Sequence, residues 1–286
     1  MNWVGFPQLG IDKLYISPYI NVFGFNIYWY GIIIAIGMSL SVLYAFFNAH
    51  KFGINKDKMI DVIIIGIVVG ICGARLYYVI FSFDSFSDNF WKIFDLRTGG
   101  LAIYGGIIFA FISGFLVCKY KKIKFLPLAD IASIGFLLGQ GIGRWGNFVN
   151  IEAYGSHTDL PWGMTSSQIP VAIQPVHPTF LYESIWCILG FVIFNLLLKY
   201  RKFDGQVLLM YLTWYGFERF FVEGLRTDSL WLIPNVIRVS QLISIILFVF
   251  SIIALVYILF FYMKKHSDKE YLYVNTQEYK NSLLKK

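Results

Sequence analysis

Seven apolar stretches follow one another along the 286-residue chain, and each is close to the length that crosses a membrane. A helix needs about 20 mainly apolar residues to span the hydrocarbon core of a bilayer. The third, fourth and sixth stretches are shorter, and glycine or charge interrupts them. The pattern predicts an all-α polytopic membrane protein with seven transmembrane helices, at about residues 27–47, 59–81, 101–118, 125–142, 179–198, 205–222 and 237–262.

The connections between these stretches alternate in charge. Sixteen of the 24 lysines and arginines lie in segments 48–58, 119–124 and 199–204 and in the tail from Met263. The intervening segments 82–100 and 143–178 are nearly neutral or acidic. Because cytoplasmic connections of membrane proteins are enriched in lysine and arginine, we expect the N-terminus outside and the C-terminus inside.

The remaining segments suggest three parts. Residues 1–26 are expected to form an outer N-terminal arm, and residues 27–262 the seven-helix membrane domain. This domain includes a small extracytoplasmic head of about residues 147–177, which is rich in glycine and proline and contains short β-like runs such as Val171–Ile173. Residues 263–286 are expected to form a basic cytoplasmic tail, which is polar and mobile from Ser267 onward.

The composition excludes a soluble enzyme and a disordered chain. Hydrophobic residues make up 57% of the chain and charged residues 14%, whereas about a quarter of the residues of a soluble protein are charged. The basic residues behind the net charge of +7 are explained by their position in the expected cytoplasmic connections. We therefore expect no nucleic-acid partner. The three cysteines lie in apolar runs and the four histidines are scattered, so we expect neither a metal nor a cofactor.

Several charged residues fall within or beside the predicted helices, where each costs about 2.5–3.5 kcal/mol on insertion scales. Asp61 and Asp130 lie near inner helix ends, and favourable interaction with the helix dipole explains both. The topology places the others on the outer side, at Arg75, Arg144, Glu183, Glu218, Arg219, Glu223 and Arg226. This distribution predicts a site in the outer leaflet, since a transport path needs polar groups through the midplane.

The sixth stretch and its outer end carry Tyr215, Arg219, Glu223 and Arg226 at a spacing that keeps them on one helix face. Glu223 has two equally good interpretations. It belongs either to the site or to a series of Glu–Arg pairs that only lowers the free-energy cost of burying these charges. Arg219, Arg226 and Arg144 together exceed the carboxylates that the sequence places nearby. Since the guanidinium fork matches phosphate oxygens, the arginines favour binding of a lipid phosphate.

The densest polar cluster follows the fourth apolar stretch. Glycines at 135, 139 and 143 repeat every fourth residue, which is common where membrane helices pack closely. Helix packing does not explain Arg144, Asn147, Asn150 and Glu152 immediately after them. We interpret this segment as a glycine-rich helix exit whose backbone N–H groups can approach an anion.

Three other classes of membrane protein are disfavoured. A transporter should show internal pseudosymmetry, and none is visible. An intramembrane protease needs a Ser/His pair or facing aspartates, which the predicted depths do not allow. A phosphoalcohol transferase needs an Asp-rich metal site that the sequence lacks.

The polar segments resemble those of one family. The segment Gly143-Arg-Trp-Gly-Asn-Phe-Val-Asn-Ile-Glu-Ala-Tyr-Gly155 closely resembles the signature of the bacterial prolipoprotein diacylglyceryl transferases. Five further ordered matches cover nearly the whole chain up to Met263, and these are Trp29-Tyr30-Gly31, Gly73-Ala-Arg-Leu-Tyr77, Gly99-Gly-Leu-Ala-Ile-Tyr-Gly-Gly106, His177-Pro-Thr-Phe-Leu-Tyr-Glu183 and Tyr215-Gly-Phe-Glu-Arg-Phe-Phe-Val-Glu-Gly-Leu-Arg226.

The resemblance implies transfer of the diacylglyceryl group of phosphatidylglycerol to the lipobox cysteine of preprolipoproteins, with release of glycerol 1-phosphate. It implies a multi-pass protein of the bacterial cytoplasmic (inner) membrane, with its active site facing the outer leaflet, and we expect a monomer. Carried over by position, catalysis would involve Arg144, Arg219, Asn147, Tyr104 and Tyr215. Phosphatidylglycerol would be bound by Arg144, Tyr30, Glu152, Gly155 and Arg226.

Two positions need separate expectations. Members of the family often carry a histidine, proposed as a base, where this chain has Tyr104, and a phenol with a pKa near 10 is a poor base at neutral pH. We therefore expect Tyr104 to position groups by hydrogen bonding, while the arginines stabilise the thiolate. Arg75 is expected to serve folding, with a buried charge partner such as Glu218, and His177 to be structural.

Overall fold

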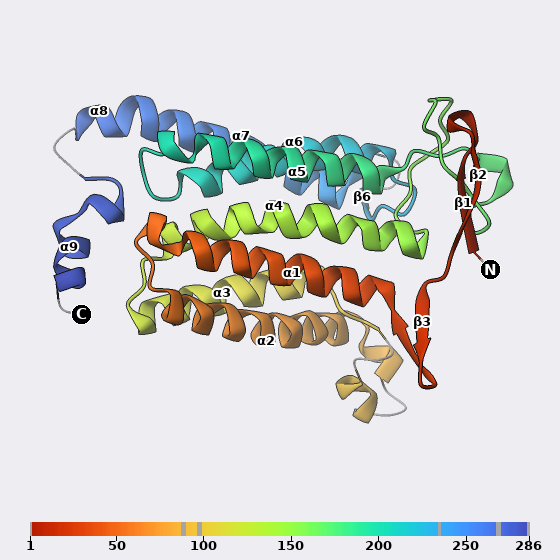
Figure 1. Cartoon of the computed structure of the whole chain (residues 1–286), viewed down its shortest axis with the longest axis horizontal. Coiled ribbons are helices and arrows are strands. Elements are labelled where there is room, and N and C mark those ends of the chain that lie inside the picture. The colour runs from red at the N-terminus through yellow and green to blue at the C-terminus, as the bar shows by residue number, and fades with distance from the viewer. Residues whose placement is uncertain (1, 87–89, 96–98, 234–235, 267–269, 285–286) are drawn as a thin grey trace. The chain divides into compact units, whose positions relative to one another are not determined.

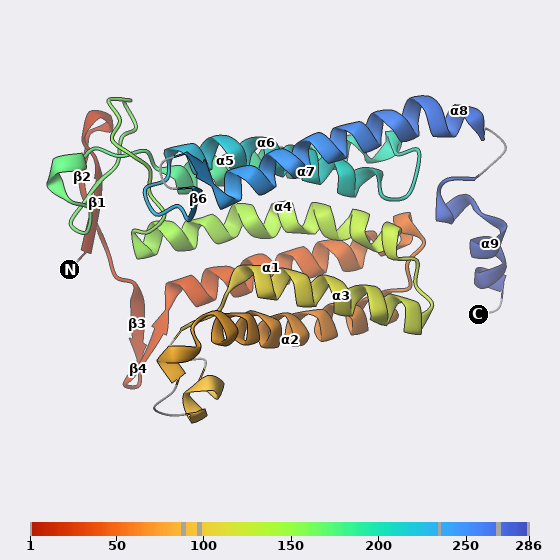
Figure 2. The same cartoon turned by 180° about the vertical axis from the view of Figure 1, so that it is seen from behind.

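The computed structural model describes residues 2–86, 90–95, 99–233, 236–266 and 270–284. The chain divides into two compact units, which we describe separately (Figures 1 and 2). Unit 1 comprises Met1–Ala45 and Ala129–Leu272, and unit 2 comprises Phe46–Leu128 and Tyr273–Lys286.

Seven helices of at least 18 residues occur in the described part of the chain, and they coincide with the seven predicted stretches. They are α1 (Trp29–Asn48), α2 (Lys56–Phe81), α3 (Ile103–Lys121), α4 (Phe125–Asn150), α5 (Thr179–Leu197), α6 (Gln206–Leu225) and α7 (Val239–Val256). The shorter elements are η1 (Pro7–Leu9), η2 (Ala49–Phe52), η3 (Phe83–Phe86), η4 (Phe90–Phe94), η6 (Val171–Ile173), η7 (Leu198–Tyr200), η8 (Tyr257–Tyr262), α8 (Met263–Lys265), η9 (Tyr273–Asn275) and α9 (Gln277–Leu284).

Six helical segments within the described ranges are long and apolar enough to cross a membrane, and α6 is the one long helix not among them. The 20-residue α6 contains Glu218, Arg219 and Glu223. These charged residues distinguish α6 from the six membrane-spanning candidates, whereas the length of α6 does not. The chain is therefore a helical, multi-pass membrane protein.

In unit 1, α4 lies between α1 on one side and α5, α6 and α7 on the other (Figures 1 and 2). Small residues bring α1 and α4 together. A Cβ atom on Gly37 would lie 3.1 Å from the carbonyl oxygen of Gly139, and the hydroxyl of Ser41 donates to the carbonyl of Gly135 at 2.7 Å. The packing function predicted for the glycine repeat is confirmed at this contact.

The N-terminal arm forms strands. β1 (Asn2–Phe6) pairs antiparallel with β2 (Ile11–Ile16) and also with β5 (Thr165–Ser166), and β3 (Tyr19–Val22) pairs with β4 (Phe25–Tyr28). A further short pair, β6 (Trp231–Ile233) with β7 (Ile237–Arg238), precedes α7. The expected all-α fold is thus helical in the membrane but carries small sheets outside the helices.

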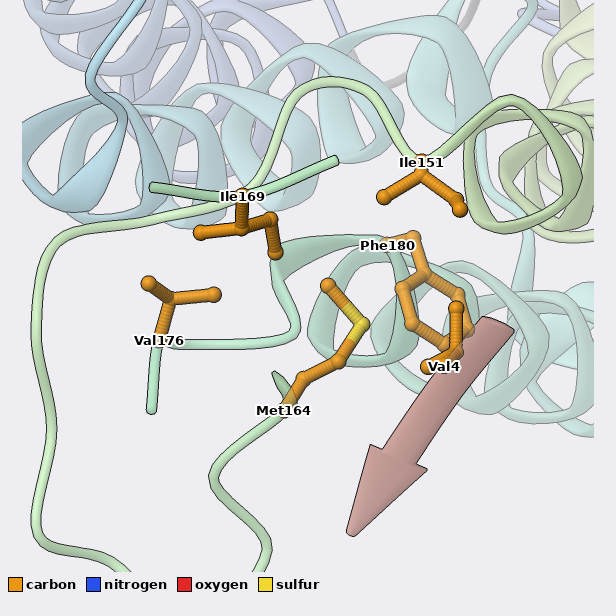
Figure 3. Close-up of a cluster of buried hydrophobic side chains, with 6 residues drawn as sticks. All are labelled: Val4, Ile151, Met164, Ile169, Val176 and Phe180. Carbon is orange, nitrogen blue, oxygen red and sulfur yellow. The ribbon is translucent and has the colours of Figure 1, made fainter. Parts of the chain in front are cut away.

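One apolar cluster joins the arm to the predicted head. Figure 3 shows its side chains converging from β1, from the segment after α4 and from the start of α5, and they are Val4, Ile151, Met164, Ile169, Val176 and Phe180. All six are less than a tenth exposed. The β-like run expected at Val171–Ile173 is wrong, because these residues form the single turn η6 and the strand of the head lies at β5.

Asp130 and Asp61 have partners of their own. Asp130 accepts hydrogen bonds from the backbone N–H groups of Gly205 and Leu208, both at 2.9 Å, so it caps the N-terminus of α6 and not that of its own helix. Asp61 forms an ion pair with Lys121 at 2.7 Å, within unit 2. The explanation from each residue's own helix dipole was therefore incomplete, because it ignored contacts with neighbouring helices.

The described residues of the C-terminal tail include two short helical elements, η9 and α9. In unit 2, η9 and α9 lie against the turn at Gly53, where a Cβ atom would lie 3.0 Å from Tyr273 and from Val274. Lys124 forms an ion pair with Glu278 at 2.9 Å, and its ammonium group lies over the Tyr273 ring, 5.4 Å from the ring centroid. Aromatic side chains within the polar tail thus provide an apolar contact that composition alone did not reveal.

Arg75 binds backbone carbonyls, and none of the described carboxylates is its partner. It is 6% exposed, and all five of its N–H groups donate at 2.6–3.1 Å to the carbonyls of Lys92, Ile93, Asp95, Gly99 and Gly100. The predicted pairing with Glu218 is wrong, since no donor of Arg75 remains for it. Arg75 instead fixes residues 92–95 and 99–100, which lie between α2 and α3.

Replacing Arg75 by alanine is expected to destabilise unit 2 by more than about 3 kcal/mol, because each hydrogen bond to a charged group contributes about 1.5–3 kcal/mol. Thermal unfolding in detergent, followed by circular dichroism, measures this. Lys92→Ala is the matched control, since it keeps the backbone carbonyl and removes only an exposed side chain. Equal unfolding temperatures for Arg75→Ala and the control would contradict the assignment.

Candidate active site

A buried cluster of charged side chains lies where α4, α5 and α6 meet in unit 1. Oε2 of Glu183 contacts both Arg144 and Arg219, the latter at 3.3 Å, and Arg219 also pairs with Glu223 one turn further along α6. The side chains of Glu183 and Glu223 are 2% and 3% exposed, and those of Arg219 and Arg144 are 13% and 21% exposed. The cluster is therefore a largely buried network of two arginines and two carboxylates.

Hydrogen bonds beside the cluster fix the three helices. Ser184 follows Glu183 and donates to the carbonyl of Gly141 at 2.7 Å, while it accepts from Trp145 Nε1 at 3.1 Å. Between α5 and α6, the indoles of Trp186 and Trp214 each donate to the other residue's carbonyl, at 3.0 and 3.1 Å, and their rings stack. These pairs hold Glu183 opposite both arginines.

A second set of polar contacts extends from Arg144 along the end of α4. Arg144 Nη1 lies 3.5 Å from Asn147 Oδ1, and Asn147 Nδ2 donates to Glu152 Oε1 at 2.8 Å. Tyr30 of α1 packs on Gly146, where a Cβ atom would lie 2.7 Å from its ring. The structure thus brings together four residues predicted for the site.

The predicted glycine-rich exit is wrong, because α4 continues through Gly143 and Gly146 to Asn150. The N–H groups of that segment belong to the helix, and its end presents carbonyl oxygens, so it does not offer free backbone donors to an anion. The chain turns only afterwards, at Ile151 and Ala153, whose φ angles are +54° and +57°. This turn folds Glu152 back toward Asn147, whose carbonyl accepts from the Glu152 N–H at 3.1 Å.

Arg226 and Gly155 lie together but apart from the Glu183 contacts. They form an isolated antiparallel bridge, and a Cβ atom on Gly155 would lie 2.7 Å from that of His177. Arg226 binds both oxygens of Asp228, at 2.9 and 2.7 Å, and these hydrogen bonds hold the pKa of Asp228 below its usual value. Every arginine of the predicted site therefore has a carboxylate partner, which corrects the surplus of positive charge inferred from the sequence.

His177 and Tyr215 occupy supporting positions. Burial lowers the pKa of His177, and its Nδ1 lies 3.1 Å from the hydroxyl of Tyr182. Tyr215 precedes Arg219 by one turn of α6 and stacks on Tyr211 with ring centroids 5.9 Å apart. Tyr104 is in the first turn of α3, in unit 2, and its contribution to the site stays a prediction.

The sequence did not reveal the role of Glu183. The sequence indicates only that Glu183 is a charged residue on the outer side. Two arginines from different helices share one of its oxygens, and only the packing of α4, α5 and α6 shows this. The available signal was an acidic residue in the first turns of an apolar helix, where burial requires a cationic partner.

These features define a class of protein, namely a multi-pass membrane protein with a buried arginine–carboxylate site. Residues 18–257 match the family described as prolipoprotein diacylglyceryl transferase. The chain belongs to the prolipoprotein diacylglyceryl transferase family.

Three similar proteins are each called phosphatidylglycerol–prolipoprotein diacylglyceryl transferase. The protein of Clostridioides difficile is 47% identical over 238 residues, which cover 83% of this chain and 93% of that protein. The protein of Finegoldia magna is 47% identical over 234 residues, covering 82% and 92%. The protein of Staphylococcus aureus strain Newman is 43% identical over 258 residues, covering 87% and 91%.

Proposed function

We propose that the protein transfers the diacylglyceryl group of phosphatidylglycerol to the lipobox cysteine of preprolipoproteins, forming a thioether and releasing glycerol 1-phosphate. The names of the relatives support both substrates. The observation that carries the proposal is the pair of buried arginines, Arg144 and Arg219, held by a common carboxylate.

The arrangement suits a displacement at carbon. The cysteine sulfur forms a bond to the glycerol carbon next to the phosphate, and the carbon–oxygen bond breaks with its electron pair going to the phosphate oxygen. Negative charge then grows on the leaving phosphate, where guanidinium groups stabilise it. Arg144 and Arg219 meet this need because Glu183 and Glu223 hold their forks in place before the lipid arrives.

The remaining predicted residues have roles that fit their positions. Asn147 and Glu152 hold the Arg144 end of the site by their mutual hydrogen bond, and Tyr30 packs on the same part of α4. Tyr215 lies on the Arg219 face of α6. Gly155 allows the chain from α4 to pass close to His177, beside Arg226. We assign these groups to binding the lipid and orienting the arginines.

The proposed topology has seven spans in a bacterial cytoplasmic membrane, with the N-terminus outside and α6 as the additional span. Its support is the concentration of lysine and arginine in alternate connections. The protein would act as a monomer, with its site facing the outer leaflet.

Ser156 lies exposed after α4 and would be outside. A cysteine placed there, in a chain without its three native cysteines, should react with an impermeant thiol reagent added outside intact cells. Labelling only after the cells are opened would contradict this orientation.

Tyr104→Phe is expected to keep most of the activity, within about tenfold of the unchanged protein, because a hydrogen bond contributes about 1 kcal/mol. The purified protein with phosphatidylglycerol and a lipobox peptide provides the assay. A loss of three or more orders of magnitude with lipid binding intact would show that the phenol acts as the base.

Mass spectrometry of the peptide tests the reaction itself. We expect the mass of one diacylglyceryl group on the cysteine after incubation with phosphatidylglycerol, and no change when serine replaces that cysteine. Absence of the cysteine adduct with active, folded protein would contradict the proposed function.

A further inference from the structure

Glu218 has a carboxylate that nothing in the described part of the chain binds. Both of its oxygens are buried and have no hydrogen-bond partner, and the residue is 6% exposed. A buried polar group without a partner costs about 1–3 kcal/mol, and more when it is charged. Burial of Glu218 therefore destabilises the fold, and a structural role does not explain why a glutamate is present at this position.

The surroundings of Glu218 are those of the arginine cluster. It precedes Arg219 on α6, and the charged and titratable groups that interact with it are Arg144 of α4, Glu183 and Cys187 of α5, and Tyr215 and Arg219 of α6. Glu183 and Glu223 already pair with the two arginines. Glu218 is thus a third carboxylate, beyond those that hold the arginines.

The carboxylate beside Glu218 also has an unpartnered atom. Oε1 of Glu183, which interacts with Glu218, is buried and has no hydrogen-bond partner among the described residues. All of these atoms are oxygens, and no donor among the described residues forms a hydrogen bond with them. A ligand that fits here must bring a proton that it can donate.

We propose that Glu218 accepts the proton of the substrate cysteine thiol. This inference rests on the proposed function, which supplies a thiol as the attacking group. A free thiol with a pKa of about 8.5 is mostly protonated at neutral pH, and only the thiolate is an effective nucleophile. The adjacent guanidinium groups favour the thiolate that proton transfer produces.

Proton transfer to Glu218 accompanies the displacement at carbon. The thiol proton moves to a Glu218 oxygen, and the sulfur lone pair forms the bond to the glycerol carbon. The electrons of the broken carbon–oxygen bond leave with glycerol phosphate, whose charge Arg144 and Arg219 stabilise. The proton passes from Glu218 to water as the products depart, and this restores the carboxylate. Glu218 is then a catalytic residue, and this chain needs no base at Tyr104.

The first test is the pH dependence of the Glu218→Gln enzyme with phosphatidylglycerol and a lipobox peptide. We expect kcat at pH 7 to fall roughly 100-fold or more, because proton transfer by a positioned group contributes about 10²–10⁴-fold. The deficit should shrink as the pH rises toward about 9, where the thiol ionises unaided. The KM for the lipid should stay within about twofold, since the arginines are unchanged.

The second test separates catalysis from folding. Glu218→Leu replaces an unpartnered buried carboxylate by an apolar side chain, so its thermal stability should equal or exceed that of the unchanged protein, while its kcat falls as in Glu218→Gln. A structural role would lower stability and activity together. Both variants are expected to lose kcat. If one of them folds poorly, the other still distinguishes a catalytic from a structural role.

Three outcomes would overturn the proposal. They are a kcat of Glu218→Gln within about fivefold of the unchanged protein, a deficit that is the same at every pH, and a change confined to the KM for the lipid. Failure of the unchanged protein to modify the peptide would instead contradict the proposed function. The two failures are thus distinguishable within one assay.

Discussion

Arg144→Ala is expected to lower kcat/KM for diacylglyceryl transfer about 1,000-fold or more. Removing one preorganised donor from a site that stabilises a developing negative charge costs about 10²–10³ in rate, and Arg144 presents two N–H groups on a planar fork. The change also leaves Glu183 with Arg219 as its remaining partner. Glycerol phosphate release from purified protein in detergent measures the effect. Lys119→Ala, which removes an exposed cation of α3, should leave the rate unchanged.

Arg144→Lys separates charge from geometry. Lysine keeps the positive charge but cannot bind two phosphate oxygens with a rigid fork. We expect it to recover less than about a tenth of the lost activity. A rate close to that of the unchanged protein would show that a point charge suffices, and the bidentate arrangement would then be wrong.

Glu183→Gln is expected to reduce both stability and activity. Removing one partner of a buried ion pair typically costs about 3–5 kcal/mol, because the opposite charge remains buried. Here a single Glu183 oxygen holds Arg144 and Arg219, and Glu223 retains only Arg219. Thermal unfolding should shift downward, and turnover should fall at least about 100-fold, since both guanidinium groups lose their fixed orientation.

Asp61→Asn provides the matched control for that variant. Its ion pair with Lys121 has side chains 45% and 34% exposed, so it should contribute less than about 1 kcal/mol. If Glu183→Gln unfolds at the same temperature as Asp61→Asn and keeps full activity, Glu183 does not organise the site.

The helices could be predicted from the sequence because apolar length depends on local composition. The end of α4 could not, since the glycines at 143 and 146 suggested a helix exit. In the structure these positions accommodate Ile34 and Tyr30 of α1, and the helix continues. A glycine that allows close approach and a glycine that ends a helix look the same in a sequence without its tertiary contacts.

The site was predicted in part for a similar reason. Arg144 and Arg219 were recognisable because arginine at membrane depth needs a partner, but that partner, Glu183, lies on a third helix. Arg75 was assigned a carboxylate because charges are visible in a sequence, whereas its actual partners are backbone carbonyls that any residue supplies. The pairing of β1 with β5 joins residues about 160 positions apart, which no local pattern indicates.

The most direct test of the account measures glycerol phosphate release and diacylglyceryl-peptide formation together, for the unchanged protein, Arg144→Ala and Lys119→Ala. We expect the two products to appear in equal amounts with the unchanged protein and with Lys119→Ala, and both to disappear with Arg144→Ala. Transfer to the peptide at an undiminished rate by folded Arg144→Ala would contradict the claim that the buried arginine site performs the reaction.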